Sequence, residues 1–79
     1  MNERIKELAE QAEDDVVADH RGDEFHKAYT QKFAELIVQE CLAIAKNRED
    51  ELESAGLLSE SNAVGNVSYR ISRQFGVNR

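Results

Sequence analysis

The most apolar stretch of the chain reads Phe33-Ala34-Glu35-Leu36-Ile37-Val38-Gln39-Glu40-Cys41-Leu42-Ala43-Ile44-Ala45. Its apolar residues recur at three- and four-residue spacing, which is typical of one face of an α-helix. A second apolar stripe (Ala34, Val38, Leu42, Ala45) lies beside the first. Helices that are apolar over most of their circumference are central in a bundle or shared between subunits. The pattern predicts a central helix whose core or oligomer stripe comprises Phe25, Tyr29, Phe33, Leu36, Ile37, Val38, Cys41, Leu42 and Ile44.

The long helix is expected over residues 23–54, because helix-favouring residues continue from this stretch until Gly56. A helix of roughly 30 residues is about 45 Å long, which exceeds what a compact domain of this size needs. Two short neighbours would cover only part of it. The excess apolar surface therefore predicts self-association into a homo-oligomer.

Two shorter helices are expected on either side, over residues 3–19 and 60–75. The second of them carries Val64, Val67, Ile71 and Phe75 at helical spacing. The expected caps and stops are Asn2 and Gly22 for the first helix, Ser59 or Ser61 at the start of the last, and Gly76 followed by Val77 at its end. The sequence thus predicts an all-α fold, a helical hairpin or a small three-helix domain, with residues 1–79 as a single helical domain.

Size and charge exclude several classes of protein. A chain of 79 residues buries too little surface to wall a large catalytic cleft. It carries 10 Lys and Arg against 16 Asp and Glu, a formal net charge of −6, which argues against direct nucleic-acid binding. No run approaches the roughly 20 apolar residues of a membrane span, so we expect a cytosolic protein. The single cysteine, Cys41, lies in the apolar stretch and is interpreted as a small core residue.

Charged side chains suggest two candidate binding surfaces. In the first helix, Glu3, Glu7, Glu10 and Asp14 form a possible acidic interaction face, which is either an imitation of a phosphate backbone or an ordinary solvated surface. In the last helix, Arg70 and Arg73 are three residues apart, so that both guanidinium groups can converge on one anion while Tyr69 stacks on a base. The alternative is that both arginines pair with carboxylates of the first helix.

No residue constellation predicts catalysis. His20 and His26 are six residues apart, which is not the three- or four-residue spacing of a metal pair on a helix. No nucleophile and base, or pair of carboxylates in contrasting environments, stands out. We expect neither an enzyme nor a cofactor or metal.

Three blocks of the chain resemble a group of small proteins encoded by tailed bacteriophages, for which no activity is assigned. The blocks are residues 1–12 (Met1-Asn2-Glu3-Arg4-Ile5-Lys6-Glu7-Leu8-Ala9-Glu10-Gln11-Ala12), 33–41 and 71–77, the last with a Phe-Gly-Val ending. The resemblance implies a phage product in the cytoplasm of an infected bacterium. Such proteins often bind and disable a host component.

These observations lead to one principal functional hypothesis and two alternatives. The principal hypothesis is a phage accessory protein that self-associates through the long helix and inhibits a host protein, for example a defence protein. The first alternative is an oligomeric sponge that sequesters a nucleotide immune signal through Tyr69, Arg70 and Arg73. The second is an acidic mimic of DNA.

Overall fold

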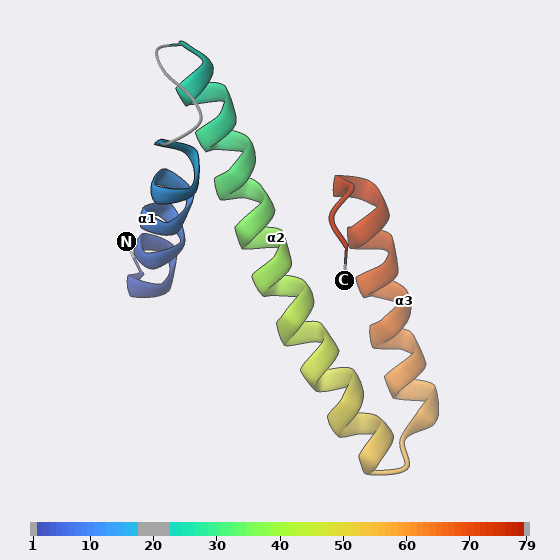
Figure 1. Ribbon diagram of the computed structural model, residues 1–79. Helices are drawn as coiled ribbons and strands as arrows, with labels where there is room; N and C mark the ends of the chain where they lie inside the picture. The colour runs from blue at the N-terminus through green and yellow to red at the C-terminus, as the bar shows by residue number, and fades with distance from the viewer. Residues whose placement is uncertain (1, 18–22, 79) are drawn as a thin grey trace. The chain divides into compact units, whose positions relative to one another are not determined.

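The computed structural model describes residues 2–17 and 23–78. It contains three helices, α1 (Glu3–Val17), α2 (Asp23–Ser54) and α3 (Leu58–Phe75) (Figure 1). No strand occurs in the described residues, so the all-α prediction is confirmed. The chain divides into two compact units, Met1–Ile37 and Val38–Arg79, and α2 contributes to both.

The first helix begins as the sequence predicts. The Oδ1 atom of Asn2 accepts a hydrogen bond from the backbone N–H of Arg4 at 2.7 Å, and the carbonyl of Asn2 accepts one from Lys6 at 3.1 Å. Asn2 is therefore an N-cap, a position at which its side chain satisfies a donor that the helix leaves open. The expected stop at Gly22 lies outside the described residues.

The core of the first unit is formed by α1 and the first half of α2. Leu8 and Ala12 of α1 are buried with Leu36 of α2, and Tyr29, Phe33 and Ile37 pack against this cluster. Along α2, the rings of Phe25, Tyr29 and Phe33 stack in succession with centroids 5.9 Å apart. At the edge of the core, Lys32 Nζ lies 3.9 Å from Asp15 Oδ2.

A glycine turn joins α2 to α3. Gly56 has φ +78°, and its N–H donates to the carbonyl of Glu53 at 3.0 Å, while the N–H of Leu57 donates to Leu52 at 2.9 Å. This is the Schellman arrangement that ends many helices. The carbonyl of Leu57 then accepts the first bond of α3, from the N–H of Ser61 at 2.9 Å. Because the turn leads directly into the helix, α3 begins at Leu58, two residues earlier than expected.

The N-cap predicted for α3 is wrong. Leu57 occupies the cap position and makes no capping bond through its side chain. Ser61 instead lies inside the helix, is buried, and donates its hydroxyl proton to the carbonyl of Glu49 in α2 at 3.0 Å.

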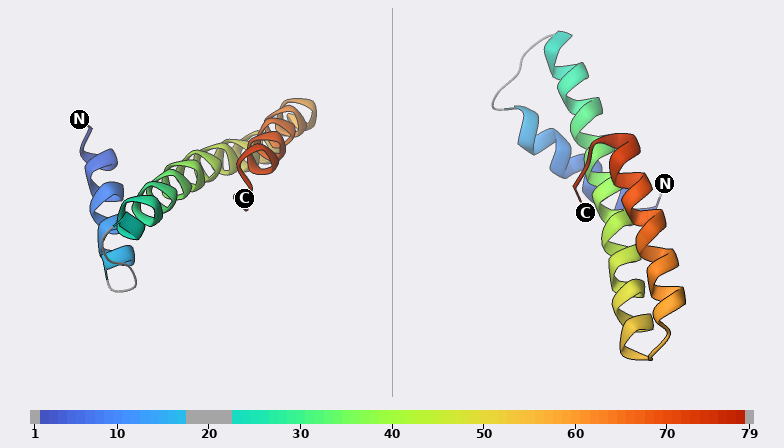
Figure 2. Two further views of the ribbon diagram at one scale, coloured as in Figure 1. Left: turned by 90° about the horizontal axis from the view of Figure 1, so that it is seen from above. Right: turned by 90° about the vertical axis from the view of Figure 1, so that its right-hand side faces the viewer.

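The second unit is an antiparallel hairpin of α3 and the second half of α2, seen from two directions in Figures 1 and 2. Small residues of α3 line the side that faces α2. Ser61 and Ser68 are buried, and a Cβ atom placed on Gly65 would lie 2.9 Å from Oε1 of Glu49. We call Ser61, Gly65 and Ser68 the small-residue seam. From α2, Leu42 and Leu52 are buried in this unit.

The end of α3 matches the sequence prediction. Gly76 adopts φ +64°, and the N–H of Val77 donates to the carbonyl of Ser72 at 3.1 Å. The Ser72 hydroxyl donates in turn to the carbonyl of Val77, whose side chain is buried. A left-handed glycine followed by a buried apolar residue is the geometry that the Gly-Val pair predicts.

The predicted stripe of the long helix is not buried uniformly. Leu36 and Leu42 are buried, whereas Phe25, Tyr29, Phe33, Ile37 and Val38 are half-buried. Cys41 and Ile44 are exposed, so the interpretation of Cys41 as a core residue is wrong for the single chain. The reason is helical phase: Cys41 lies about 100° around the helix from Leu42, which is the residue that the hairpin buries.

Candidate interaction surfaces

Several large apolar side chains of the second unit are on its surface. Ile44 is 64% exposed, Val67 56% and Phe75 63%, whereas the residues that α3 buries against α2 are two serines. Val64 and Ile71 are half-buried beside them. We call this set the hairpin apolar face: Cys41, Ile44, Val64, Val67, Ile71 and Phe75.

Helical phase places these residues on one side of the hairpin. On α2, Cys41 lies roughly a sixth of a turn and Ile44 roughly a third of a turn from the mean direction of Leu42 and Leu52. On α3, Ile71 and Val67 are rotated away from the small-residue seam, in the same direction about their own helix axis as Cys41 and Ile44 are about theirs. Because the two helices are right-handed and run antiparallel, these displacements point to the same side. The residues of the hairpin apolar face therefore form one surface across two helices.

Charged residues border this face near the α2–α3 turn. Arg48, about two helical turns before Gly56, follows Ile44 on the same side of α2 and pairs with Glu51 at 3.2 Å. Glu60, about one turn after Gly56, precedes Val64 and Val67 on α3. Glu60 is exposed and makes no ion pair within the described part of the chain. The face thus carries opposite charges at its turn end and apolar residues beyond them.

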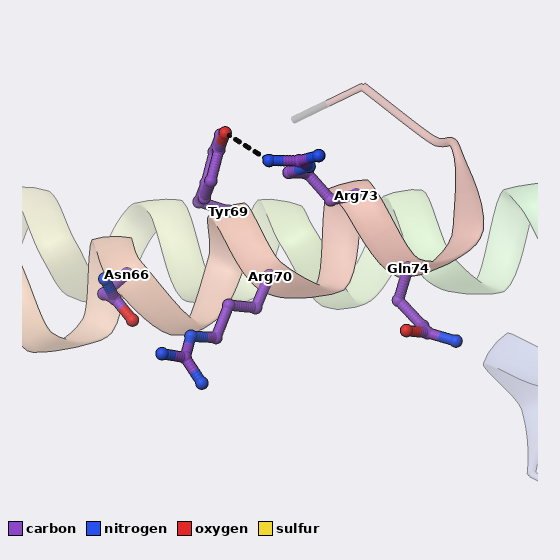
Figure 3. A pocket seen from close by; sticks show the side chains of 5 residues that line it. All are labelled: Asn66, Tyr69, Arg70, Arg73 and Gln74. Carbon is purple, nitrogen blue, oxygen red and sulfur yellow. Dashed lines mark hydrogen bonds between the residues drawn. The ribbon is translucent and has the colours of Figure 1, made fainter.

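The predicted basic site lies along the solvent side of α3, as Figure 3 shows. Asn66, Tyr69, Arg70, Arg73 and Gln74 line an open groove of about 640 Å³. Arg73 Nη1 donates to the Tyr69 hydroxyl at 3.2 Å, and its guanidinium carbon lies 5.7 Å from the centroid of the Tyr69 ring. In the described residues, neither Arg70 nor Arg73 has a carboxylate within ion-pair distance.

The two arginines do not converge in this structure. Arg73 points toward Tyr69, while Arg70 extends along the opposite side of the helix with Asn66 and Gln74 (Figure 3). The i, i+3 spacing permits the two guanidinium groups to converge. The hydrogen bond and the cation–π contact with Tyr69, however, hold the Arg73 guanidinium away from Arg70. One anion cannot be held by both groups in this conformation.

The predicted acidic face forms a stripe along α1. Glu3, Glu7, Glu10 and Asp14 are all exposed and lie on the side of the helix opposite Leu8 and Ala12. Two of these carboxylates are paired within the helix, Glu7 with Arg4 at 3.0 Å and Glu3 with Lys6 at 4.0 Å. Because neighbouring cations offset part of the negative charge, the stripe is less dense than the predicted DNA mimic requires.

The described residues contain no metal site, because they include no group of three or more His, Cys, Asp or Glu that could hold an ion. His26 is exposed and its ring makes an edge contact with Phe25, with centroids 5.9 Å apart. His20 lies outside the described residues. No described helix has the length and apolar character needed to cross a membrane.

Comparisons with protein-family models, curated proteins and solved structures found no match.

Proposed function

We propose that the chain is a non-catalytic phage accessory protein that self-associates through the hairpin apolar face and acts by binding and inhibiting a host protein. The observation that carries the proposal is the exposure of Ile44, Val67 and Phe75 on one side of a small hairpin. Contiguous exposed apolar surface on a small domain is typical of protein interaction sites, because its burial against a partner removes it from water.

The packing inside the hairpin explains why this apolar surface is available. On the α3 side, the two helices meet through serines and a glycine, which leaves Val67 and Phe75 exposed. A domain of this size often completes its core by oligomerising. Self-association would bury the side chains that the hairpin itself leaves in water.

The phage setting comes from the resemblance of residues 1–12, 33–41 and 71–77, and it suggests a protein of the host bacterium as the target. The acidic stripe of α1, which shares no residue with the hairpin apolar face, is the proposed surface for this target. Charged surfaces contribute to the rate and specificity of protein association.

Self-association is tested by comparing two substitutions on adjacent exposed residues of α2. Ile44→Glu places a charge in the hairpin apolar face, whereas Ala43→Glu places the same charge on another side of the helix. Light scattering coupled to size exclusion should give an oligomer for the wild type and Ala43→Glu, and a monomer for Ile44→Glu. A monomeric wild type at high micromolar concentration contradicts the proposal.

Host binding is tested by purifying the tagged protein from its bacterial host. A host protein should co-purify in fixed ratio and be lost from the double variant Glu7→Lys/Glu10→Lys. Two equal charge changes on another side of α2, Asp50→Lys and Glu53→Lys, serve as the control, with helicity verified for both variants. Retention of every co-purifying protein by all variants would refute a role for the acidic stripe, and absence of any host protein in fixed ratio would refute host binding.

The groove on α3 supports a second candidate function, sequestration of a nucleotide. Its specific basis is that Tyr69, Arg70 and Arg73 line one groove and that neither arginine has a carboxylate partner in the described residues. Native mass spectrometry of gently purified protein would then show extra mass of nucleotide size. That mass should be absent from Arg70→Ala/Arg73→Ala while the oligomer persists; a bare wild-type assembly rejects this function.

A further inference from the structure

We infer that a second copy of this chain covers the hairpin apolar face in one arrangement: a two-fold four-helix bundle with both α2–α3 turns at the same end, so that Arg48 of each copy faces Glu60 of the other. The inference rests on the proposed self-association and adds the geometry of the interface.

The apolar part of the face suits a second hairpin. Exposed apolar residues lie on both helices, Cys41 and Ile44 on α2 and Val67 and Phe75 on α3, with the half-buried Ile71 between the last two. A hairpin of the same shape covers both stripes at once and forms a four-helix bundle. A two-fold axis parallel to the helices places α2 of each copy beside α3 of the other, so every neighbouring pair of helices runs antiparallel.

The charges select this arrangement. Arg48 and Glu60 lie near the turn end of the same face and have opposite signs. With both turns at one end, each arginine lies near the glutamate of the other copy, displaced by about one helical turn or 6 Å along the axis, within reach of the arginine side chain. With the turns at opposite ends, the two-fold axis would place α2 beside α2 and α3 beside α3, so Arg48 of one copy would not face Glu60 of the other.

The test is a charge exchange between two variants. Arg48→Glu alone gives two repulsive contacts in its dimer, and Glu60→Arg alone does the same. For each, we expect a dissociation constant about tenfold higher than that of the wild type at low salt, since exposed ion pairs are individually weak. In a one-to-one mixture, the heterodimer regains two attractive contacts, so the dissociation constant should return to near the wild-type value.

Mixing the two variants distinguishes an ion pair between copies from an ion pair within one copy. A pair between Arg48 and Glu60 of the same chain would stay broken in both variants and could not be restored by mixing. Lys46→Glu is the matched control: Lys46 also pairs along α2, with Asp50 at 3.2 Å, but lies on another side of the helix. Lys46→Glu should leave dimerisation unchanged.

A wild type that is monomeric overturns both this inference and the proposed self-association. A wild-type dimer whose variants are not rescued by mixing overturns the arrangement alone.

Discussion

Leu42 and Ile44 stand two residues apart in the same apolar stretch, yet the structure predicts different consequences when each is truncated to alanine. Leu42 is 2% exposed, the most deeply buried large side chain of the described residues, whereas Ile44 is 64% exposed. Replacing a buried leucine by alanine costs about 2–5 kcal/mol, because transfer energy is lost and a cavity remains. This is a large part of the roughly 4–12 kcal/mol expected for a domain of this length.

The cost for Ile44→Ala should be much smaller in the monomer. Burying a whole side chain of this size contributes about 1.5–3 kcal/mol to the free energy of unfolding. Because roughly a third of the Ile44 side chain is covered, its truncation should cost about 0.5–1 kcal/mol. Urea unfolding monitored by circular dichroism at low protein concentration measures both values. At high concentration the cost of Ile44→Ala should rise, because its side chain then becomes buried between copies. Equal losses for the two variants at low concentration would refute this assignment of core and surface.

Three further outcomes are expected. Leu36→Asp should lose several kcal/mol of stability by burying an unpaired carboxylate, seen as lost helicity, whereas Ala34→Asp on an exposed position should remain folded. Gly56→Ala should lower stability by about 1–2 kcal/mol in thermal unfolding, since φ is +78° there; an unchanged transition would contradict the left-handed turn. The exposed thiol of Cys41 should react with a thiol reagent rapidly in dilute solution and more slowly as concentration rises, and a rate independent of concentration would place it outside the interface.

The sequence was sufficient to predict the all-α class, the bounds of α2 and two further helix ends. Asn2 and the Gly76-Val77 pair act through local backbone bonds, and local chemistry is visible in local sequence. The start of α3 was mispredicted because serine is a good N-cap in general. The Schellman turn at Gly56 leads into the helix before either serine is reached, so Leu57 takes the cap position instead.

The hairpin interface could not be predicted from apolar periodicity. Val64, Val67, Ile71 and Phe75 mark an apolar side of α3, but Ser61 and Ser68 are the residues it buries most deeply. Ser61, Gly65 and Ser68 are four and three residues apart, which is the spacing of one face of a helix and was the available signal for this contact. Apolar periodicity does not detect it, because these residues are small or polar. Serines can be buried here because each hydroxyl donates to a nearby carbonyl, Glu49 or Val64.

The candidate basic site was predicted only as a set of residues. Tyr69, Arg70 and Arg73 do line one groove, as the spacing suggests. Their side-chain directions depend on the contact between Arg73 and Tyr69, a rotamer choice that sequence spacing does not determine. The opposite charges of Arg48 and Glu60 at one end of the apolar face were also missed, because they come to the same end of one face only once the turn at Gly56 brings α3 alongside α2.

Each unit of this chain is built from helices that are adjacent in sequence, with α2 as the shared element. Almost every tertiary contact within a unit therefore closes only a short loop, and the relative contact order is low. Helical domains of this kind fold in microseconds to milliseconds, because little chain entropy is lost before contacts form. Each unit has buried residues of its own, Leu8, Ala12 and Leu36 in the first and Leu42 and Leu52 in the second, so we expect the two units to open separately. Amide exchange should then divide α2 into two segments that lose protection independently.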